Sequence, residues 1–349
     1  MREIKIDQQI INDDSECFVI AEVGHNHQGS VDKCKKIFKE AAICGANAVK
    51  LQKRNNKALF TKKEYAKAYD NPNSYGVTYG EHREFLEFGK DEYLELKSYA
   101  ENLGLIFFST AFDLDSVDFL EDIGVPCYKI ASGDLRTLPL IEKVAQTKKP
   151  LFISTGASNM EEVKQAYEMV LRYHNQVCFM QCTAGYPVEP KEGHLNVIDT
   201  YRREFPEAVI GYSGHDSGIL LPIVAYLKGG RVVEKHFTLN RAWKGTDHKF
   251  SLEPVGMRKM VRDLKRTKEC LGNPEKICLD CESAGRIKMG KSTYTAKNLT
   301  AGTVLTEEDL SYKTPGGGIA PNQLDQVLGR TLICDIQEDE LIKLDMLLS

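Results

Sequence analysis

The chain has 349 residues, 42% hydrophobic and 28% charged, with a formal net charge of −4; these values are typical of a soluble globular protein and exclude disorder, collagen-like repeats and a disulfide scaffold. The segment from Gly290 onward carries 5 basic and 9 acidic residues, and the rest carries 41 of each. A near-neutral body with an acidic end offers phosphate backbones no broad basic surface, so we expect no nucleic-acid partner.

The N-terminal segment is too polar and acidic for a secretory signal, and no apolar run reaches the roughly 18 residues that span a bilayer. We therefore expect no membrane association. Ten cysteines are scattered without disulfide-like spacing, and Cys127, Cys178, Cys182 and Cys334 lie in apolar runs. This pattern favours reduced, buried thiols in a cytoplasmic protein.

Short β-branched or aromatic runs recur along the first two-thirds of the chain and predict eight strands. They cover 18–24, 47–53, 105–112, 126–133, 150–156, 177–183, 208–215 and 231–237. Amphipathic stretches with apolar residues three and four apart lie between most of them and predict helices, for example at 31–45 and 160–173. Strands alternating with helices indicate a parallel sheet. Eight such units in about 250 residues fit a (β/α)8 TIM barrel of the α/β class.

The second strand–helix interval contains an insertion, NPNSYGVTYGEHREFLEF, at residues 71–88. Long insertions in the βα loops of a barrel usually serve the active-site face. A lid or a dimer contact without specific chemistry is the alternative.

After the last predicted barrel helix, the sequence pattern changes from alternating strands and helices to a polar connector followed by short strands and turns. We expect a barrel domain at 1–272, a polar linker at 273–290 and a separate small domain at 291–349. Cys278 and Cys281 form a CxxC motif in the linker, but only Cys270 is near, so a four-ligand zinc site is not supported. No predicted strand leads directly into Gly316–Gly318, and the segment has no GK[ST] ending. The three glycines therefore predict a turn rather than a phosphate-binding loop.

Polar side chains follow the predicted strands at their carboxyl ends, which meet at one face of a barrel. In chain order they are Glu22; Lys50 and Gln52; Ser109 and Thr110; Lys129 and Ser132; Ser154 and Thr155; Thr183 and Tyr186; Ser213 and His215; Glu234 and His236. Because side chains alternate along a strand, Lys50 shares a face with Gln52, and Glu234 shares a face with His236.

Two lysines beside Ser and Thr hydroxyls form a good site for a small phosphorylated anion. Two histidines from neighbouring strands, near carboxylates, form half of a divalent-metal site. Lys129 lies in an apolar strand, so we expect its side chain to be buried. A lysine is buried either beside an anionic ligand or as a Schiff-base amine. Ser154 and Thr155 have the alternative of capping the next helix. His25 and His27 lie in a loop, and their alternative to a functional role is to shape that loop.

The motifs IAEVGHNHQG, VKLQK, FSTAFD, KIASGD, QCTAGYP, IGYSGHDSG, VEKHFTL and GTDHKFSLEP resemble those of the sialic acid synthases. That family condenses phosphoenolpyruvate with an N-acylated hexose by a metal-dependent mechanism with C–O cleavage. The segment KSTYTAKNLTAGTVLTEEDL is similar to the antifreeze-like (SAF) domain that follows the family's barrel. Collinear resemblance over nearly the whole chain implies an enzyme of sialic acid biosynthesis, a phosphoenolpyruvate-dependent transferase.

The resemblance also implies residue roles. It assigns a divalent ion, Mn²⁺ or Mg²⁺, to His215 and His236, and it places Glu22 among the groups that position and work on the sugar, where our candidate role for Glu22 is proton transfer. Phosphoenolpyruvate binding is implied for Lys50, Thr110, Lys129, Ser132, Ser154 and Ser213. Sugar binding is implied for Gln52, Tyr186, Glu234 and Asp247.

The family further implies a domain-swapped homodimer in which the SAF domain reaches the partner's site with an arginine just before a Pro-Gly. In this sequence the position is Thr314, in KTPGGG. This departure predicts a different contact to the substituent on the sugar nitrogen.

The sugar has three alternatives: N-acetylmannosamine, its 6-phosphate, or a diacetamido-trideoxyhexose of the legionaminic or pseudaminic type. The rival enzyme classes are a class I aldolase or lyase with Lys129 as Schiff base and condensing barrels for shorter sugar phosphates, which lack the C-terminal domain. A non-catalytic carbohydrate- or ice-binding protein is disfavoured, because an ice-binding face should be flat and Thr-rich and this segment is acidic.

Overall fold

The computed structural model describes residues 2–348, which divide into two compact units after Gly272. In the first unit eight parallel strands close into a barrel in the order β10-β3-β4-β5-β6-β7-β8-β9. This confirms the predicted fold class, and each strand lies within a predicted range. The strands are β3 (Phe18–Glu22), β4 (Ala48–Lys53), β5 (Ile106–Ala111), β6 (Tyr128–Ile130), β7 (Leu151–Ser154), β8 (Val177–Gln181), β9 (Val209–Gly214) and β10 (Val232–His236).

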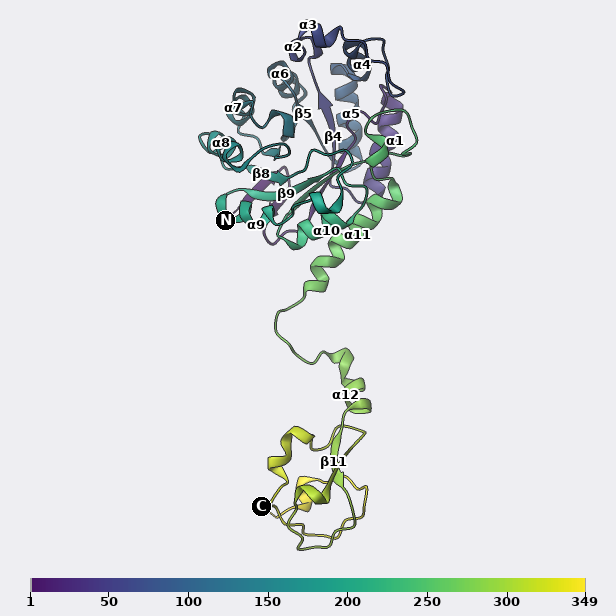
Figure 1. Ribbon diagram of the computed structural model, residues 1–349, viewed down its shortest axis with the longest axis vertical. Coiled ribbons are helices and arrows are strands. Elements are labelled where there is room, and N and C mark those ends of the chain that lie inside the picture. The colour runs from purple at the N-terminus through teal and green to yellow at the C-terminus, as the bar shows by residue number, and fades with distance from the viewer. Residues whose placement is uncertain (1, 349) are drawn as a thin grey trace. The chain divides into compact units, whose positions relative to one another are not determined.

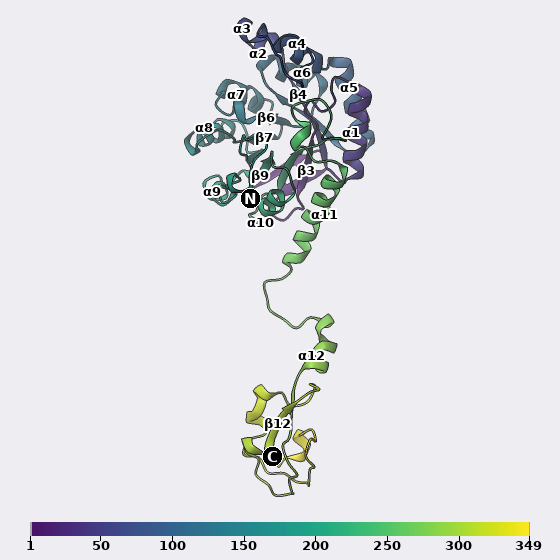
Figure 2. The same cartoon turned by 45° about the vertical axis from the view of Figure 1, so that its right-hand side comes forward.

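Helices surround the barrel and bury its outer face (Figure 1; Figure 2). Every residue of β3 and of β6 to β10 is buried, as expected for parallel strands covered on both faces. The surrounding helices are α1 (Val31–Ile43), α5 (Lys90–Asn102), α6 (Leu114–Ile123), α7 (Leu138–Gln146), α8 (Met160–Leu171), α9 (Val197–Glu204), α10 (Leu220–Leu227) and α11 (Pro254–Leu271).

Local signals fix where these helices begin and end. Helix α1 begins after Ser30, whose hydroxyl accepts from the N–H of Lys33. Helix α6 begins after Asp113, whose carboxylate accepts from the N–H of Ser116, and ends at Gly124 with φ 71°. A glycine suits that left-handed end because it carries no Cβ.

A β-hairpin that the sequence analysis did not predict precedes the barrel. It pairs β1 (Glu3–Ile6) with β2 (Gln9–Asn12) in antiparallel register. Its apolar residues Ile4, Ile6 and Ile11 are buried and belong to the barrel's hydrophobic core.

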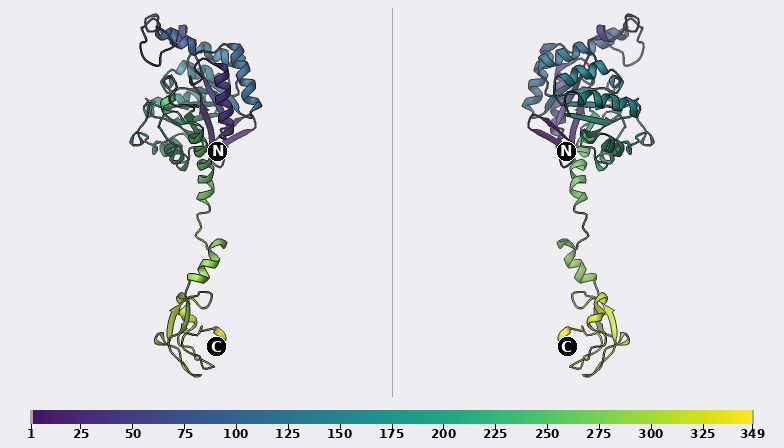
Figure 3. Two further views of the ribbon diagram at one scale, coloured as in Figure 1. Left: turned by 90° about the vertical axis from the view of Figure 1, so that its right-hand side faces the viewer. Right: turned by 90° about the vertical axis from the view of Figure 1, so that its left-hand side faces the viewer.

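The hairpin lies at the N-terminal ends of the strands. The Lys5 N–H donates to the side chain of Gln176, just before β8, and Arg231, just before β10, donates to the carbonyl of Asp13. The hairpin therefore closes the end of the barrel opposite to the strands' carboxyl ends. Figure 3 shows the N-terminus at one end of this unit and the insertion at the other.

The 71–88 insertion belongs to a longer βα connection that holds three short helices, α2 (Asn56–Leu59), α3 (Lys62–Tyr65) and α4 (Tyr79–Leu86). Helix α4 begins with a capping box: the Thr78 side chain accepts from the Glu81 N–H, and the Glu81 carboxylate accepts from the Thr78 N–H. The insertion thus contains an ordered helix rather than only a loop.

The second unit contains α12 (Ser283–Met289), the antiparallel strands β11 (Ser292–Thr295) and β12 (Leu310–Lys313), and short 3-10 turns, one of them at Glu307–Asp309. It has its own apolar core, which includes Leu305, Val327 and Ile342. Thr314 directly follows β12.

All ten cysteines are free thiols. Cys127, Cys178 and Cys182 are buried as predicted, whereas Cys334 is exposed, so its predicted burial is wrong. Cys334 lies outside the small core of the second unit, and the apolar run around it therefore did not indicate burial. Between residues 2 and 348, the structure contains no helix with the length and apolar character that crossing a membrane requires.

Replacing Ile4 with Ala should lower the free energy of unfolding of the barrel by about 2–5 kcal/mol, because it leaves a cavity under the hairpin. Ile10→Ala is the matched control: Ile10 lies in the same hairpin but is 52% exposed, and its replacement should change stability by less than about 0.5 kcal/mol. Urea unfolding followed by the fluorescence of Trp243, the single tryptophan and a residue of the first unit, reports on the barrel. Equal effects of the two substitutions would contradict the burial argument.

Candidate active site

A cavity of about 410 Å³ opens at the carboxyl ends of the barrel strands. All the side chains for which the resemblance implied a role line this cavity. They are Glu22, Lys50, Gln52, Thr110, Lys129, Ser132, Ser154, Tyr186, Ser213, His215, Glu234, His236 and Asp247.

Strand alternation decides which strand-end residues reach the cavity. Ser109 and Thr155 were also noted at strand ends, but they lie outside the cavity lining. The Ser109 hydroxyl contacts the Tyr93 hydroxyl of α5 at 3.2 Å, and the Thr155 hydroxyl donates to the Met180 carbonyl. These two residues serve packing around the barrel.

Two buried lysines and two buried glutamates form the floor of the cavity. Lys50 Nζ lies 2.5 Å from Glu22 Oε2, donates to Thr110 Oγ1 at 2.7 Å, and lies 3.9 Å from Glu234 Oε2. Lys129 Nζ lies 3.8 Å from Glu234 Oε1. Each ammonium therefore has a carboxylate near it, as a buried charge requires.

The two glutamates differ in pKa because Glu22 pairs with Lys50 alone, whereas Glu234 lies near both lysines. Burial raises the pKa of Glu22 to about 7, against the opposing charge of Lys50. Burial acts on Glu234 as well, but the charges of Lys129 and Lys50 outweigh it and hold the pKa of Glu234 below its usual value. Near neutral pH one carboxyl can exchange a proton while the other stays ionised, which is the arrangement that acid–base chemistry needs.

Serine hydroxyls line the wall beside this floor. Ser213 donates to Glu234 at 3.1 Å, and Ser132 accepts from the Gly156 N–H at 3.0 Å. The Ser154 hydroxyl is buried and has no hydrogen-bond partner among the described residues. A buried hydroxyl without a partner is unfavourable in the protein alone, and a bound anion at this wall would satisfy it.

The imidazoles of His215 and His236 lie next to each other, with ring centroids 5.5 Å apart. Burial lowers the pKa of His215 to about 3 and that of His236 to about 4, so both rings are neutral at physiological pH. His236 Nδ1 is buried without a hydrogen-bond partner among the described residues, and it lies 3.8 Å from Asp247 Oδ2.

Two neutral imidazoles, one with an orphaned ring nitrogen, have the donor chemistry of a divalent-metal site. Within residues 2–348, no three or more His, Cys, Asp or Glu side chains are arranged to hold a metal ion. The two imidazoles therefore fit part of the ligand set of a divalent ion, and any further ligands would come from outside these residues.

A buried ion pair on the outer side of the barrel fixes the two histidines. Lys235, next to His236, lies 2.7 Å from the carboxylate of Asp216, which directly follows His215. The Tyr212 hydroxyl donates to the same carboxylate oxygen at 2.9 Å. This network joins the ends of β9 and β10 and so holds the imidazoles side by side.

The upper part of the cavity carries the remaining predicted side chains. Gln52 Nε2 donates to Glu22 Oε1 at 2.6 Å, and the Tyr186 ring packs on His215 with centroids 4.1 Å apart. Tyr186 is 58% exposed. These groups line the part of the cavity above the floor.

The sequence analysis missed His25, Arg54 and Arg83, which also line the cavity. Arg54 directly follows β4 and continues the alternation of Lys50 and Gln52, so that spacing could have identified it. His25 had been left with the alternative of shaping its loop. Nothing in the sequence pattern placed Arg83 at the cavity, because it comes from the insertion.

The insertion packs over the loops of its own barrel. The Tyr75 hydroxyl donates to the Lys244 carbonyl at 2.7 Å, and the Gly245 N–H donates to Asn73 at 3.0 Å. Gly29 permits a close approach to helix α4, because a Cβ there would lie 2.6 Å from the Phe85 carbonyl oxygen. The insertion therefore borders the cavity and supplies Arg83 to it.

Comparison with known proteins places this site in a family. An N-acetylneuraminate-9-phosphate synthase of Mus musculus is 39% identical over 327 residues, which cover 93% of this chain and 91% of that protein. An N,N'-diacetyllegionaminic acid synthase of Legionella pneumophila is 34% identical over 322 residues, 90% of each chain.

The fold comparison agrees with these relatives. The crystal structure of the N-acetylneuraminic acid (sialic acid) synthetase from Leptospira borgpetersenii superposes with a TM-score of 0.72 at 29% identity, over 81% of this chain and 95% of that one. Residues 290–348 match the SAF domain, and residues 37–276 match the NeuB family. The chain is an enzyme that belongs to the NeuB family of sialic acid synthases and carries a C-terminal SAF domain.

Proposed function

We propose that this enzyme condenses phosphoenolpyruvate with an N-acylated hexose and releases inorganic phosphate. The observation that carries the proposal is the single cavity that holds two ammonium groups, an unpartnered serine hydroxyl and two neutral imidazoles. N-Acetylmannosamine or its 6-phosphate is the favoured sugar class, since the product named for the mouse relative is a phosphorylated N-acetylneuraminate. A diacetamido-trideoxyhexose is the alternative, in view of the Legionella relative.

Phosphoenolpyruvate would bind above the floor. Lys50 and Lys129 would neutralise its carboxylate and phosphate, and Ser132, Ser154, Ser213 and Thr110 would orient it. The hexose would contact phosphoenolpyruvate and extend above it, held by Gln52, Tyr186 and Asp247 and, from the floor, by Glu234. Holding two reactants in this order can supply about 7–11 kcal/mol of the reduction in barrier.

The reaction would join C3 of phosphoenolpyruvate to the aldehyde carbon of the open-chain sugar. Water adds at C2, and phosphate leaves with the bridging oxygen, so the C–O bond breaks. Glu22 would take the proton that the attacking water loses. His215 and His236 would hold a Mn²⁺ or Mg²⁺ ion, which when bound supplies Lewis-acid polarisation of the aldehyde oxygen.

The proposal extends to the assembly. A homodimer in which the SAF domain of one chain completes the site of the other would bring Thr314 to the sugar in place of the arginine usual in the family. The lost guanidinium would leave the contact to the N-acyl group to other residues.

Lys129 gives one argument for the rival aldolase chemistry. Burial lowers its pKa, as a Schiff-base amine requires. A Schiff-base enzyme would act on free pyruvate, release no phosphate and be inactivated by borohydride.

Phosphate release from phosphoenolpyruvate should depend on an added N-acylated hexose. With substrate labelled by oxygen-18 at the bridging position, the label should appear in the released phosphate, because the C–O bond breaks. Mass spectrometry of phosphate and sugar product checks this result. Label in the ketone product would overturn the C–O mechanism, and turnover of pyruvate in place of phosphoenolpyruvate would favour the aldolase.

His215→Ala and His236→Ala should each lower turnover by more than about 100-fold, because each removes one ligand of the ion. Both variants should also bind Mn²⁺ more weakly in a titration followed by electron paramagnetic resonance. His194→Ala is the control, because His194 is exposed and lies outside this cavity. Full activity of the wild-type enzyme in excess chelator would count against the metal site.

The rate should depend on the ionisation of Glu22. Because burial raises the pKa of this carboxyl to about 7, the proton-accepting form is lost below that pH. We expect kcat/KM to fall with decreasing pH below about 7 and to level off above it. Glu22→Gln should lower the rate by about 10²- to 10⁴-fold and remove this limb of the profile. An unchanged limb in the variant would assign the titration to another group.

A further inference from the structure

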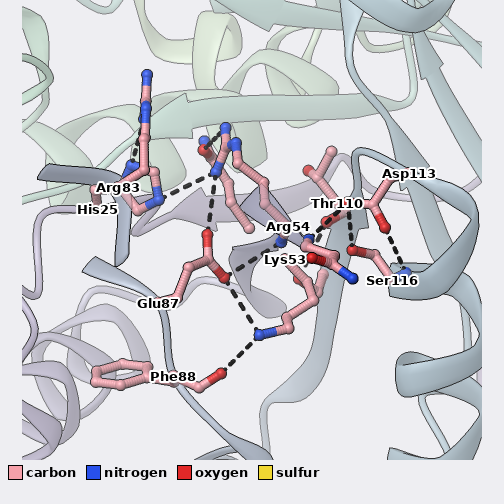
Figure 4. Close-up of polar contacts among 12 residues, drawn as sticks. His25, Lys53, Arg54, Arg83, Glu87, Phe88, Thr110, Asp113 and Ser116 are labelled. Atoms are coloured by element: carbon pink, nitrogen blue, oxygen red, sulfur yellow. Dashed lines mark hydrogen bonds and ion pairs between the residues drawn. The ribbon is translucent and has the colours of Figure 1, made fainter. Parts of the chain in front are cut away.

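Two guanidinium groups line the cavity in addition to the lysines of the floor, and Figure 4 shows both of them beside His25. Arg54 extends from the end of β4, and Arg83 extends from α4 of the insertion. Arg54 Nη1 lies 3.1 Å from His25 Nε2, and Arg83 Nη1 lies 3.2 Å from His25 Nδ1. The imidazole therefore sits between the two cations.

His25 cannot accept a hydrogen bond from both guanidinium groups at once. Burial and the two nearby guanidiniums lower the pKa of His25 well below its usual value, so the ring is neutral. A neutral imidazole accepts a hydrogen bond at one nitrogen and carries a proton on the other. One of the two guanidiniums consequently meets an N–H rather than an acceptor, and it keeps a free donor at the cavity.

Carboxylates do not neutralise this cluster. Glu87 lies 3.9 Å from Arg54 Nη1 and also pairs with Lys53 at 3.3 Å. Within residues 2–348, Arg83 makes no ion pair within 4.0 Å; the hydrogen-bond partners of its guanidinium are the Tyr79 hydroxyl, at 2.7 and 2.9 Å, and His25. Arg54 is 8% exposed. Arg83 is partly exposed, and Glu87 is the one carboxylate that pairs with either guanidinium among the described residues, so positive charge exceeds negative charge here and favours an anionic ligand.

The position of the cluster favours the sugar over phosphoenolpyruvate as that ligand in the proposed arrangement. Arg54 Nη2 donates to Gln52 Oε1 at 2.7 Å, and Gln52 is one of the proposed sugar-binding residues. Gln52 and Glu22, joined by the 2.6 Å hydrogen bond from Gln52 Nε2 to Glu22 Oε1, lie between Arg54 and Lys50.

We infer that Arg54, Arg83 and His25 form a subsite for a phosphomonoester at the end of the hexose remote from the reacting aldehyde. The inference rests on the proposed function, because that function places the aldehyde carbon of the sugar against phosphoenolpyruvate and so directs the last carbon of the sugar away from the floor, toward the rim. The substrate is then an N-acylated hexose 6-phosphate. Arginine suits this role because its planar fork binds phosphate oxygens in pairs.

The test compares the specificity ratio of the full-length enzyme, kcat/KM for N-acetylmannosamine 6-phosphate divided by kcat/KM for N-acetylmannosamine. The wild type should favour the phosphorylated sugar. Arg83→Gln should lower the ratio about 10- to 100-fold, as expected for a lost charge-assisted hydrogen bond. Arg83→Lys, which keeps the charge without the fork, should lower it less and serves as the second variant if Arg83→Gln does not fold.

Lys63→Gln is the matched control, because it removes one positive charge from the exposed surface of α3 in the same βα connection. Its ratio should equal that of the wild type. An Arg83→Gln variant whose KM rises for phosphoenolpyruvate rather than for the sugar phosphate would overturn the inference. So would a wild type that prefers the unphosphorylated sugar, although the proposed function would stand. Absence of phosphate release with every sugar would instead overturn the proposed function.

Discussion

The pairing of two buried ammonium groups with two buried carboxylates in the mouth of the barrel is the constraint on which the site depends. Lys50 lies 2.5 Å from Glu22 and 3.9 Å from Glu234, and Lys129 shares Glu234. Without the glutamates, the lysines would be uncompensated charges in the most buried part of the fold. With them, the site keeps two cations near a cavity wall whose Ser154 hydroxyl lacks a partner.

The same pairing separates the two glutamates chemically. The carboxyl of Glu22 can change its protonation near neutral pH, whereas Glu234 stays ionised because both lysines act on it. Neighbouring groups of the same type thus acquire different tasks through their surroundings alone.

The sequence predicted the barrel and the convergence of its strand-end residues because both follow from simple periodicity. A buried strand every few tens of residues closes the ring, and alternation brings Lys50 and Gln52 to one face. The β1–β2 hairpin escaped prediction because its apolar residues are few and lie among charged ones. Arg83 escaped because its place at the cavity depends on tertiary contacts, such as that of Asn73 with Gly245, which local patterns do not encode.

The hairpin has a kinetic consequence. Ile4, Ile6 and Ile11 are buried in the core at the far end of the barrel, so reactants would reach the lysines from the carboxyl ends of the strands. If phosphoenolpyruvate binds at the lysines and the hexose binds over it, phosphoenolpyruvate must bind first. The enzyme would then follow a compulsory order of addition, and a sugar that arrived early would block its partner's entry.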